Sequence, residues 1–232
     1  PFFELHGTGY IVLEYERGRT LSQVLAAGPL PEAELKPLLL NLLGGLDAVH
    51  SRGILHRDLK PSNIIIRDNG SPVLIDFGAA RDFTSRHSRS ITAIAAPGYS
   101  PPEQYGVGGQ QGPWSDIYAL GATLYKLLTG VVPYRGANAL TTLDMHATSP
   151  LIPPSKRAPE FEIPPEADEI IGRALAKTPE TRYGSADELA RALRSALGVQ
   201  RSGLLRRPEG SAIAAVERPA TTPPVAAAPG RP

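Results

Sequence analysis

The chain has 232 residues, 41% of them hydrophobic, which is enough for one domain with a sizeable core and an additional tail. Its formal net charge of +1 implies no strong attraction to nucleic acid or to an anionic membrane surface. The absence of cysteine excludes disulfides and thiolate metal sites and suits a cytosolic compartment. No apolar run approaches the roughly 20 residues of a membrane-spanning helix, and the sequence does not open with a signal peptide.

The first predicted element is a strand over residues 10–15, which are mainly β-branched and aromatic. The segment His6-Gly7-Thr8-Gly9 just before it begins like a glycine-rich phosphate loop, but glycine is missing where Val12 stands. We therefore interpret this segment as a turn. A polar connection and a short helix over residues 20–26 follow.

The strongest helical pattern lies between Leu35 and Val49, where apolar residues recur at the spacing of one helix face. Pro31 and the acidic residues beside it favour the start of this helix, and Gly53 favours its end. Pro37 falls inside the pattern and removes a backbone hydrogen bond. We therefore expect the regular helix to begin later than Pro31, or to bend at Pro37.

Two short apolar runs follow at residues 64–66 and 73–75, with Asp68-Asn69-Gly70 between them. This combination predicts a β-hairpin with a tight turn. Residues 79–113 are rich in Ser, Thr, Gly and Pro and are expected to be irregular.

Three helices are predicted in the second half of the chain. Residues 115–129 are apolar on nearly all sides and predict a buried helix. A second helix is expected over 165–177. Ser185 and Glu188 have the spacing of a capping box and predict a final helix that ends at Gly198.

Polar clusters flank the predicted hairpin on both sides. His56-Arg57-Asp58-Leu59-Lys60-Pro61-Ser62-Asn63 precedes it, and Asp76-Phe77-Gly78 follows it. Each of these residues alone is more often a turn former or a surface charge. The hairpin, however, returns the chain so that Asn63 and Asp76 can lie side by side, and both are hard oxygen ligands of the kind that Mg²⁺ prefers. The order, spacing and strand context agree with one another, which argues against coincidence.

These two clusters resemble the catalytic loop and the metal-binding motif of protein kinases. From about residue 4 to about residue 198 the sequence resembles the bacterial eukaryotic-like serine/threonine protein kinases. The resemblance implies an α+β protein-kinase fold over residues 1–198. Residues 1–15 would be a remnant of the small lobe with the hinge strand, residues 16–198 the mostly helical large lobe, and residues 199–232 a disordered Pro/Ala/Arg-rich linker or tail.

The resemblance also implies roles for the residues of the catalytic loop, with ATP and Mg²⁺ as cofactors. Asp58 would be the catalytic base, and Lys60 would place a cation near the transferred phosphate. Asn63 and Asp76 would bind magnesium. His56 is given a structural role.

A nucleotide pocket is implied around the hinge. Adenine would meet the backbone of Glu14 and Glu16, with Leu13 at the back of the pocket. Ile65 and Ile75 would supply an apolar floor, although ordinary core packing explains these two isoleucines equally well.

Three further residues fit the family pattern. Glu103 closes Pro97-Gly98-Tyr99-Ser100-Pro101-Pro102-Glu103, which resembles the end of a kinase activation loop, and Arg182 matches its usual ion-pair partner. Two separate surface charges are the alternative for this pair. Asp116 matches a position that hydrogen-bonds the catalytic-loop backbone; an ordinary first-turn helix acid is the other interpretation.

The expected partner is a protein substrate, with autophosphorylation within the activation loop. A phosphate there could order the loop by pairing with Arg57. The candidate acceptors are Thr84, Ser85, Ser88, Ser90 and Thr92.

Two departures from the family affect these expectations. The sequence contains no glycine-rich loop and no strand lysine with a partner glutamate, so we expect an incomplete fragment with weak or no activity. Ala96 stands where the family usually has a threonine that contacts the catalytic residues. A non-catalytic, pseudokinase-like scaffold is therefore the alternative function, and a small-molecule phosphotransferase is a further one. We expect a cytoplasmic kinase domain; a membrane anchor beyond the tail stays open.

Overall fold

The computed structural model describes residues 2–6, 8–27, 32–77, 81–82, 96–105 and 109–198. Its strands form three small antiparallel sheets, ordered β1–β2, β3–β5–β6 and β4–β7. The strands are β1 (Phe2–Leu5), β2 (Thr8–Ile11), β3 (Arg19–Thr20), β4 (Ile54–Leu55), β5 (Ile64–Ile66), β6 (Pro72–Leu74) and β7 (Arg81–Asp82).

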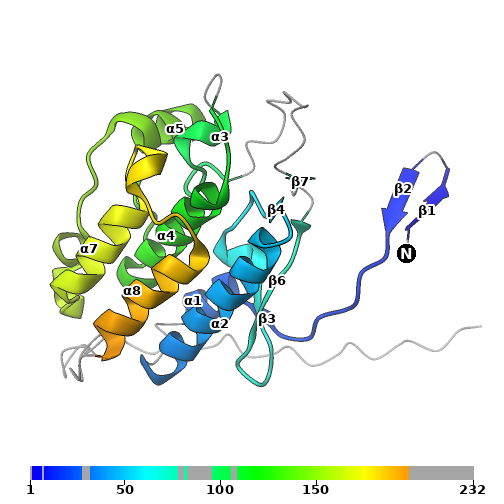
Figure 1. The fold of residues 1–232 in the computed structure, drawn as a ribbon, viewed down its shortest axis with the longest axis horizontal. Helices are drawn as coiled ribbons and strands as arrows, with labels where there is room; N and C mark the ends of the chain where they lie inside the picture. The colour runs from blue at the N-terminus through cyan, green and yellow to red at the C-terminus, as the bar shows by residue number, and fades with distance from the viewer. Residues whose placement is uncertain are drawn as a thin grey trace, which may run out of the picture.

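Most of the described chain is helical, and the sheet β3–β5–β6 lies beside α2 (Figure 1). The helices α2, α4, α7 and α8 pack against one another to form the body of the molecule. The helices are α1 (Leu21–Ala27), α2 (Glu32–His50), α3 (Pro102–Tyr105), α4 (Pro113–Thr129), α5 (Ala139–Thr148), α6 (Pro154–Arg157), α7 (Pro165–Ala174) and α8 (Ala186–Gly198).

Helix α4 is the centre of the core, as its all-round apolar sequence predicts. Its side chains are buried on every face, including both tyrosines, Tyr118 and Tyr125. Gly121 permits close packing against α7, because a Cβ at this position would come within 2.8 Å of the Cβ of Ala174. The helix ends at Gly130, which adopts a left-handed φ of 76°.

Helix α2 matches the predicted apolar face, and its leucines from Leu35 to Leu46 are largely buried. It begins at Glu32 and runs through Pro37 without interruption. The start therefore lies one residue after Pro31, in agreement with one of the two predicted alternatives. The chain leaves the helix through Gly53 (φ 72°), whose N–H bonds the carbonyl of His50.

The β5–β6 hairpin is confirmed. Ile64 pairs with Leu74, and Gly70 takes a left-handed φ of 79° in the turn. The side-chain oxygen of Asn69 accepts hydrogen bonds from the N–H and the hydroxyl of Ser71. Ile75, predicted in the second strand, lies just beyond it.

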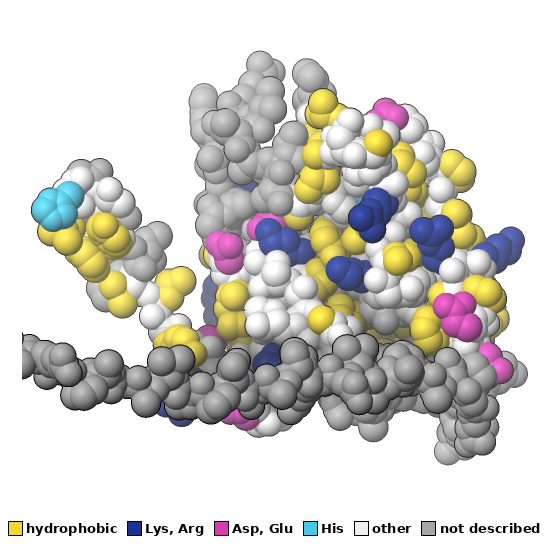
Figure 2. Space-filling model, turned by 180° about the vertical axis from the view of Figure 1, so that it is seen from behind, with side chains coloured by type: hydrophobic (Ala, Val, Ile, Leu, Met, Phe, Trp, Pro, Cys, Tyr) yellow, Lys and Arg dark blue, Asp and Glu magenta, His cyan; other side chains and the backbone are white. Residues whose placement is uncertain are grey.

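The strand predicted over residues 10–15 is wrong in extent. The observed strand β2 covers Thr8–Ile11, pairs with β1, and leaves residues 12–15 without regular structure. The turn predicted before it is present, because the hairpin reverses between Leu5 and Thr8. Figures 1 and 2 show this hairpin standing apart from the helical body, with hydrophobic side chains open to solvent. A strand pattern at residues 12–15 therefore has no neighbouring strand to pair with.

Two other boundaries differ from, or refine, the predictions. The helix predicted over 165–177 ends at Ala174, because the chain turns there and the carbonyls of Ala176 and Lys177 accept hydrogen bonds from the nearby Arg182 side chain. At the start of α8 the Ser185 hydroxyl caps the Glu188 N–H, while the Glu188 carboxylate reaches Gly184.

The structure adds β1, β3, β4, β7, α3, α5 and α6 to the predicted elements. Residues 199–232, predicted to be a linker, lie outside the described residues. Within the described part of the chain, no helix combines the length and apolarity needed to cross a membrane.

Candidate active site

Asp116, in the first turn of α4, binds the start of the loop that follows β4. Its Oδ2 accepts the N–H of His56 at 2.8 Å and its Oδ1 accepts the N–H of Arg57 at 2.8 Å. His50, at the end of α2, places its Nε2 2.8 Å from Oδ2. Asp116 is fully buried, so a charged group in the core fixes the loop backbone. This is the predicted role of Asp116; the contact with His50 was not predicted.

Asp58, Lys60 and Asn63 form one cluster within this loop. The Lys60 Nζ lies 2.6 Å from Asp58 Oδ2, and the side chains of Lys60 and Asp58 are 22% and 9% exposed. The Asn63 amide donates to both the carbonyl and Oδ2 of Asp58, each at 2.9 Å. The side-chain nitrogen of Asn63 is therefore occupied by Asp58, and its side-chain oxygen remains to accept other hydrogen bonds or to bind a cation.

The hairpin brings Asp76 back beside this cluster. The Ile75 N–H donates to the Asn63 carbonyl at 3.0 Å, so Asp76 follows directly on a residue paired with Asn63. The buried His56 accepts the Asp58 N–H at Nδ1, which leaves Nε2 to donate to the Ile75 carbonyl. Its ring also lies 4.6 Å from that of Phe77. His56 therefore has the structural role predicted for it.

Backbone strain concentrates at this site. Among the described residues four non-glycine residues have positive φ, and two of them are Arg57 (φ 67°) and Asp76 (φ 62°). Such conformations cost energy and persist where the surrounding structure holds them, which is common at functional sites.

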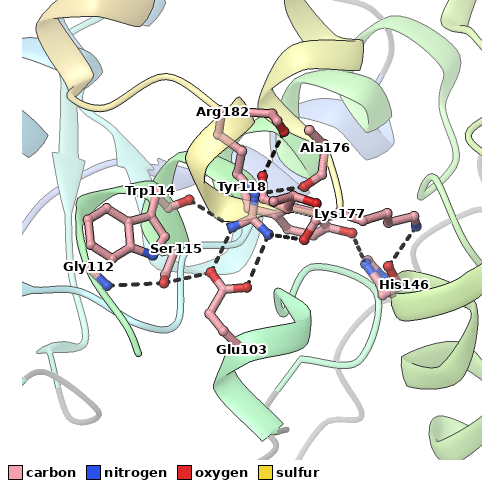
Figure 3. Close-up of polar contacts among 11 residues, drawn as sticks. Glu103, Gly112, Trp114, Ser115, Tyr118, His146, Ala176, Lys177 and Arg182 are labelled. Atoms are coloured by element: carbon pink, nitrogen blue, oxygen red, sulfur yellow. Dashed lines mark hydrogen bonds and ion pairs between the residues drawn. The ribbon is translucent and has the colours of Figure 1, made fainter. Parts of the chain in front are cut away.

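A second polar centre anchors α3 (Figure 3). Arg182 binds Glu103 through two hydrogen bonds of 2.7 and 3.1 Å, and both side chains are buried. The Ser115 hydroxyl donates to the same carboxylate, and Arg182 also donates to the carbonyls of Trp114, Ala176 and Lys177. The predicted ion pair is present, and the interpretation as two separate surface charges is wrong.

Comparison with known proteins assigns this chain to a family. Residues 1–193 match the protein kinase domain family. The chain belongs to the protein kinases. It is 34% identical to the serine/threonine-protein kinase PknH of Mycobacterium tuberculosis, over 99% of this chain and 38% of that protein. It is 34% identical to PknB of Mycolicibacterium smegmatis over 88% of this chain and 31% of that protein. A probable serine/threonine-protein kinase of Streptomyces coelicolor is 38% identical, over 78% and 27%. The chain thus spans less than two fifths of the length of these relatives.

Within this kinase domain, the residues predicted to hold adenine are only partly brought together. Leu13 is 74% exposed. Glu16 is drawn to the β5–β6 hairpin, because its carboxylate pairs with Arg67 at 2.8 and 2.6 Å. Gly18 packs directly on β5, where a Cβ would come within 2.8 Å of the Ile65 side chain. The segment that follows Glu16 therefore lies beside Ile65.

The donor set at Asn63 and Asp76 fits a magnesium–nucleotide site. Magnesium usually takes one or two protein oxygens and completes its shell with phosphate oxygens and water. The Asn63 side-chain oxygen and the Asp76 carboxylate supply that number. The described residues contain no cluster of three or more His, Cys, Asp or Glu that could hold a metal by themselves.

Several predicted residues of the kinase domain cannot be placed. Gly78 and the candidate phosphate acceptors Thr84, Ser85, Ser88, Ser90 and Thr92 lie outside the described residues. Ala96 is described and is 7% exposed. Its carbonyl accepts the N–H groups of Tyr99 and Ser100, so its backbone is ordered although its side chain carries no hydroxyl.

Three further contacts of the kinase domain were not predicted from the sequence. The Gln104 amide donates to the Arg57 carbonyl at 2.8 Å and joins α3 to the catalytic loop. Lys177 donates to the His146 carbonyl at 2.6 Å, and the His146 ring bonds the Tyr118 hydroxyl at 2.8 Å (Figure 3). The tyrosine at position 118, inside a helix predicted to be buried, was the available signal, since a buried tyrosine hydroxyl needs a partner.

Burial lowers the pKa values of Lys177 and His146. Desolvation lowers the pKa of Lys177 to about 8, and the nearby Arg182 guanidinium adds to this effect. Desolvation also lowers the pKa of His146 to about 4, with the charge of Lys177 as the second cause. His146 is therefore neutral at physiological pH.

Proposed function

We propose that this kinase domain transfers the γ-phosphate of ATP to serine or threonine hydroxyls of proteins. The observation that carries the proposal is the cluster of Asp58, Lys60 and Asn63, with Asp76 returned beside it by the hairpin. The names of the relatives, serine/threonine-protein kinases in three genera, support the same acceptor class. Autophosphorylation of the hydroxyls between residues 84 and 92 belongs to this proposal.

Asp58 would accept or orient the proton of the incoming hydroxyl. Its carboxylate is fixed by Asn63 and by Lys60, so it needs no rearrangement when the hydroxyl arrives. Lys60 would meet the charge that builds up on the transferred phosphate, since its ammonium already lies 2.6 Å from Asp58.

Asn63 and Asp76 would hold magnesium, which would neutralise phosphate charge when bound. Asn63 would do so through its side-chain oxygen, because its nitrogen is used by Asp58. The base of the nucleotide would lie along the backbone of Glu14 and Glu16, beside Leu13, Ile65 and Ile75.

The proposal is tested by replacing Asp76 with asparagine in the full-length gene product that contains these residues. The measurement is transfer of labelled γ-phosphate from ATP to a basic acceptor protein at several magnesium concentrations. We expect a loss of about a hundredfold or more for Asp76→Asn, since one metal-binding charge is removed. Asp68→Asn, in the exposed β5–β6 turn, is the matched control and should keep the wild-type rate. Equal rates for both variants would contradict the metal role of Asp76.

Ala96 favours a second candidate, a scaffold that binds nucleotide without turnover. Its methyl group occupies a buried position where the family usually has a threonine that hydrogen-bonds the catalytic residues. Nucleotide binding by the full-length product without any phosphate transfer would favour the scaffold. A polypeptide limited to these 232 residues should have weak or no transfer activity in either case, because it carries no lysine before Lys36 to hold the α- and β-phosphates.

A further inference from the structure

The segment that joins β2 to β3 has little structure of its own. Residues 12–18 form no helix or strand, and they run as an extended line from the β1–β2 hairpin to the sheet β3–β5–β6 (Figure 1). From residue 12 to residue 19 every residue is exposed except Glu16. Exposed backbone without regular hydrogen bonds opens locally at little cost. A contact from outside the segment is therefore needed to hold it in one conformation.

Arg67 supplies such a contact through Glu16. Its Nε donates to Glu16 Oε2 at 2.8 Å, and one of its terminal nitrogens donates to Oε1 at 2.6 Å. Two parallel hydrogen bonds fix the orientation of the carboxylate as well as its distance. Within the described part of the chain, no other ion pair or side-chain hydrogen bond involves residues 12–19.

Arg67 is itself held firmly by the β5–β6 hairpin. Its N–H donates to the Ser71 carbonyl at 3.0 Å, and its own carbonyl accepts the Gly70 N–H at 2.8 Å. Both of its backbone groups are thus used within the turn, so the guanidinium extends from a fixed point. The pairing of β3 with β5 fixes the segment only from Arg19 onward.

Both acidic residues of the segment act on the Arg67 guanidinium. The hydrogen bonds from Arg67 lower the pKa of Glu16, which keeps this carboxylate charged. The hydrogen bond to Glu16 raises the pKa of Arg67, and the charge of Glu14 adds to this shift. Glu14 and Glu16 are the two residues whose backbone is proposed to meet adenine.

One hairpin therefore connects the two ends of the proposed nucleotide site. Asn63 directly precedes β5, and Asp76 follows Ile75, whose N–H bonds the Asn63 carbonyl. Arg67 lies at the turn, at the opposite end of the same two strands. We infer that Arg67 is a positioning residue for the nucleotide: by binding Glu16 it holds the adenine segment in a fixed place relative to the magnesium residues. This role of Arg67 rests on the proposed function.

The test measures nucleotide affinity and turnover separately in the full-length gene product with Arg67 replaced by alanine. We expect the KM for ATP and the Kd of a non-hydrolysable ATP analogue to rise about two- to fivefold, as for the loss of an exposed ion pair. The kcat at saturating ATP should keep its wild-type value, because Arg67 takes no part in the proposed chemistry. Arg191→Ala, which breaks the exposed pair with Asp187 on α8, is the matched control and should change none of these values.

A reversed ion pair tests the contact itself. Glu16→Arg and Arg67→Glu should each weaken binding of the analogue, and the two together should restore much of the affinity, since only the combination rebuilds an ion pair. Hydrogen exchange of the amides of residues 13–17, measured without nucleotide, should be faster in Arg67→Ala than in the wild type.

The outcomes separate this role from phosphate transfer. Wild-type protein that binds the analogue, with Arg67→Ala binding it equally tightly, would overturn the role of Arg67 and leave the proposed function intact. Unchanged hydrogen exchange, or a lower kcat with an unchanged KM, would overturn it as well. Wild-type protein that binds no analogue would contradict the proposed function, and the role of Arg67 with it.

Discussion

Asp116 supports the catalytic loop from outside the catalytic residues themselves. It lies 60 and 59 positions from the two backbone N–H groups that it binds, and it is fully buried. Its carboxylate accepts hydrogen bonds from a segment that is distant in sequence, so no local sequence pattern predicts the contact. The geometry of Asp58 thus depends on a side chain that does not touch the reacting groups.

Replacing Asp116 with alanine tests this support. The N–H groups of His56 and Arg57 would lose their partner, and each unpaired buried donor costs about 1–3 kcal/mol. We expect a loss of about 2–5 kcal/mol in the free energy of unfolding, measured with denaturant. Asp144→Ala, at an exposed position of α5, should change it by less than about 0.5 kcal/mol. An equal effect of the two substitutions would show that Asp116 does not stabilise the loop.

The lowered pKa of His146 predicts that the free energy of unfolding depends on pH. Its folded pKa, about 4, is lower than its ordinary value of 6.5, so the unfolded chain binds more protons between these values. Its contribution is complete above pH 6.5 and is lost as the pH falls toward 4, by about 3 kcal/mol at most.

The comparison is with His146→Asn, which keeps a short polar side chain facing Tyr118. The difference in unfolding free energy between wild type and variant should shrink or reverse from about pH 7 to about pH 4. A difference that stays constant over this range would contradict the assignment of a neutral, buried His146.

At the scale of elements, α3 is fixed to the helical body by one ion pair. Glu103 and Arg182 are 79 positions apart and buried together, and further carbonyls accept from the guanidinium. Removing one partner leaves the other charge buried without compensation.

Glu103→Gln should therefore reduce the free energy of unfolding by about 3–5 kcal/mol. Asp187→Asn, which breaks the exposed i,i+4 pair with Arg191 on α8, should cost less than about 0.5 kcal/mol. Both are read from chemical denaturation curves. A loss under about 1 kcal/mol for Glu103→Gln would mean that α3 is held by other contacts.

The packing of α4 on α7 gives a matched pair of glycine substitutions. Gly121→Ala places a methyl group 2.8 Å from Ala174 and should destabilise the fold by about 1–3 kcal/mol, despite alanine's higher helix propensity. Gly172→Ala, in α7, meets no atom within 4 Å and should stabilise by about 0.4–1 kcal/mol. Thermal denaturation separates the two, and the same sign for both would refute the close approach of these helices.

The elements that could be predicted are those whose signal is local. The leucine spacing of α2, the apolar run of α4 and the Asn-Gly turn of the β5–β6 hairpin each lie within one segment. The two-residue strands β3, β4 and β7 carry no period of their own, because they form only where distant segments meet. The same reason explains the wrong extent of the strand at residues 10–15.

The candidate site also has features with a local sequence signal and features that depend on distant segments. The motif around Asp58 and Asp76 is contained in one short stretch of sequence and was recognised through its resemblance to the family. The bonds from His50 to Asp116 and from Gln104 to Arg57 join separate elements and required the fold to be seen. The resemblance also placed Leu13 at the back of a pocket, whereas it is largely exposed.

At the scale of the whole molecule, the surroundings of the two ends of α2 differ. The catalytic cluster follows its C-terminal end, and an apolar cavity opens at its N-terminal half. The β1–β2 hairpin stands apart from the helical body (Figure 1).

The most direct test of the account is the rate of labelled phosphate transfer by the full-length gene product with Asp58 replaced by asparagine. The substitution keeps the size of the side chain and removes the carboxylate that we propose to receive the hydroxyl proton. We therefore expect Asp58→Asn to lower the rate by about 10²–10⁴-fold, with magnesium–ATP binding retained. Unchanged transfer by Asp58→Asn would contradict the catalytic role of the cluster on which the proposed function rests.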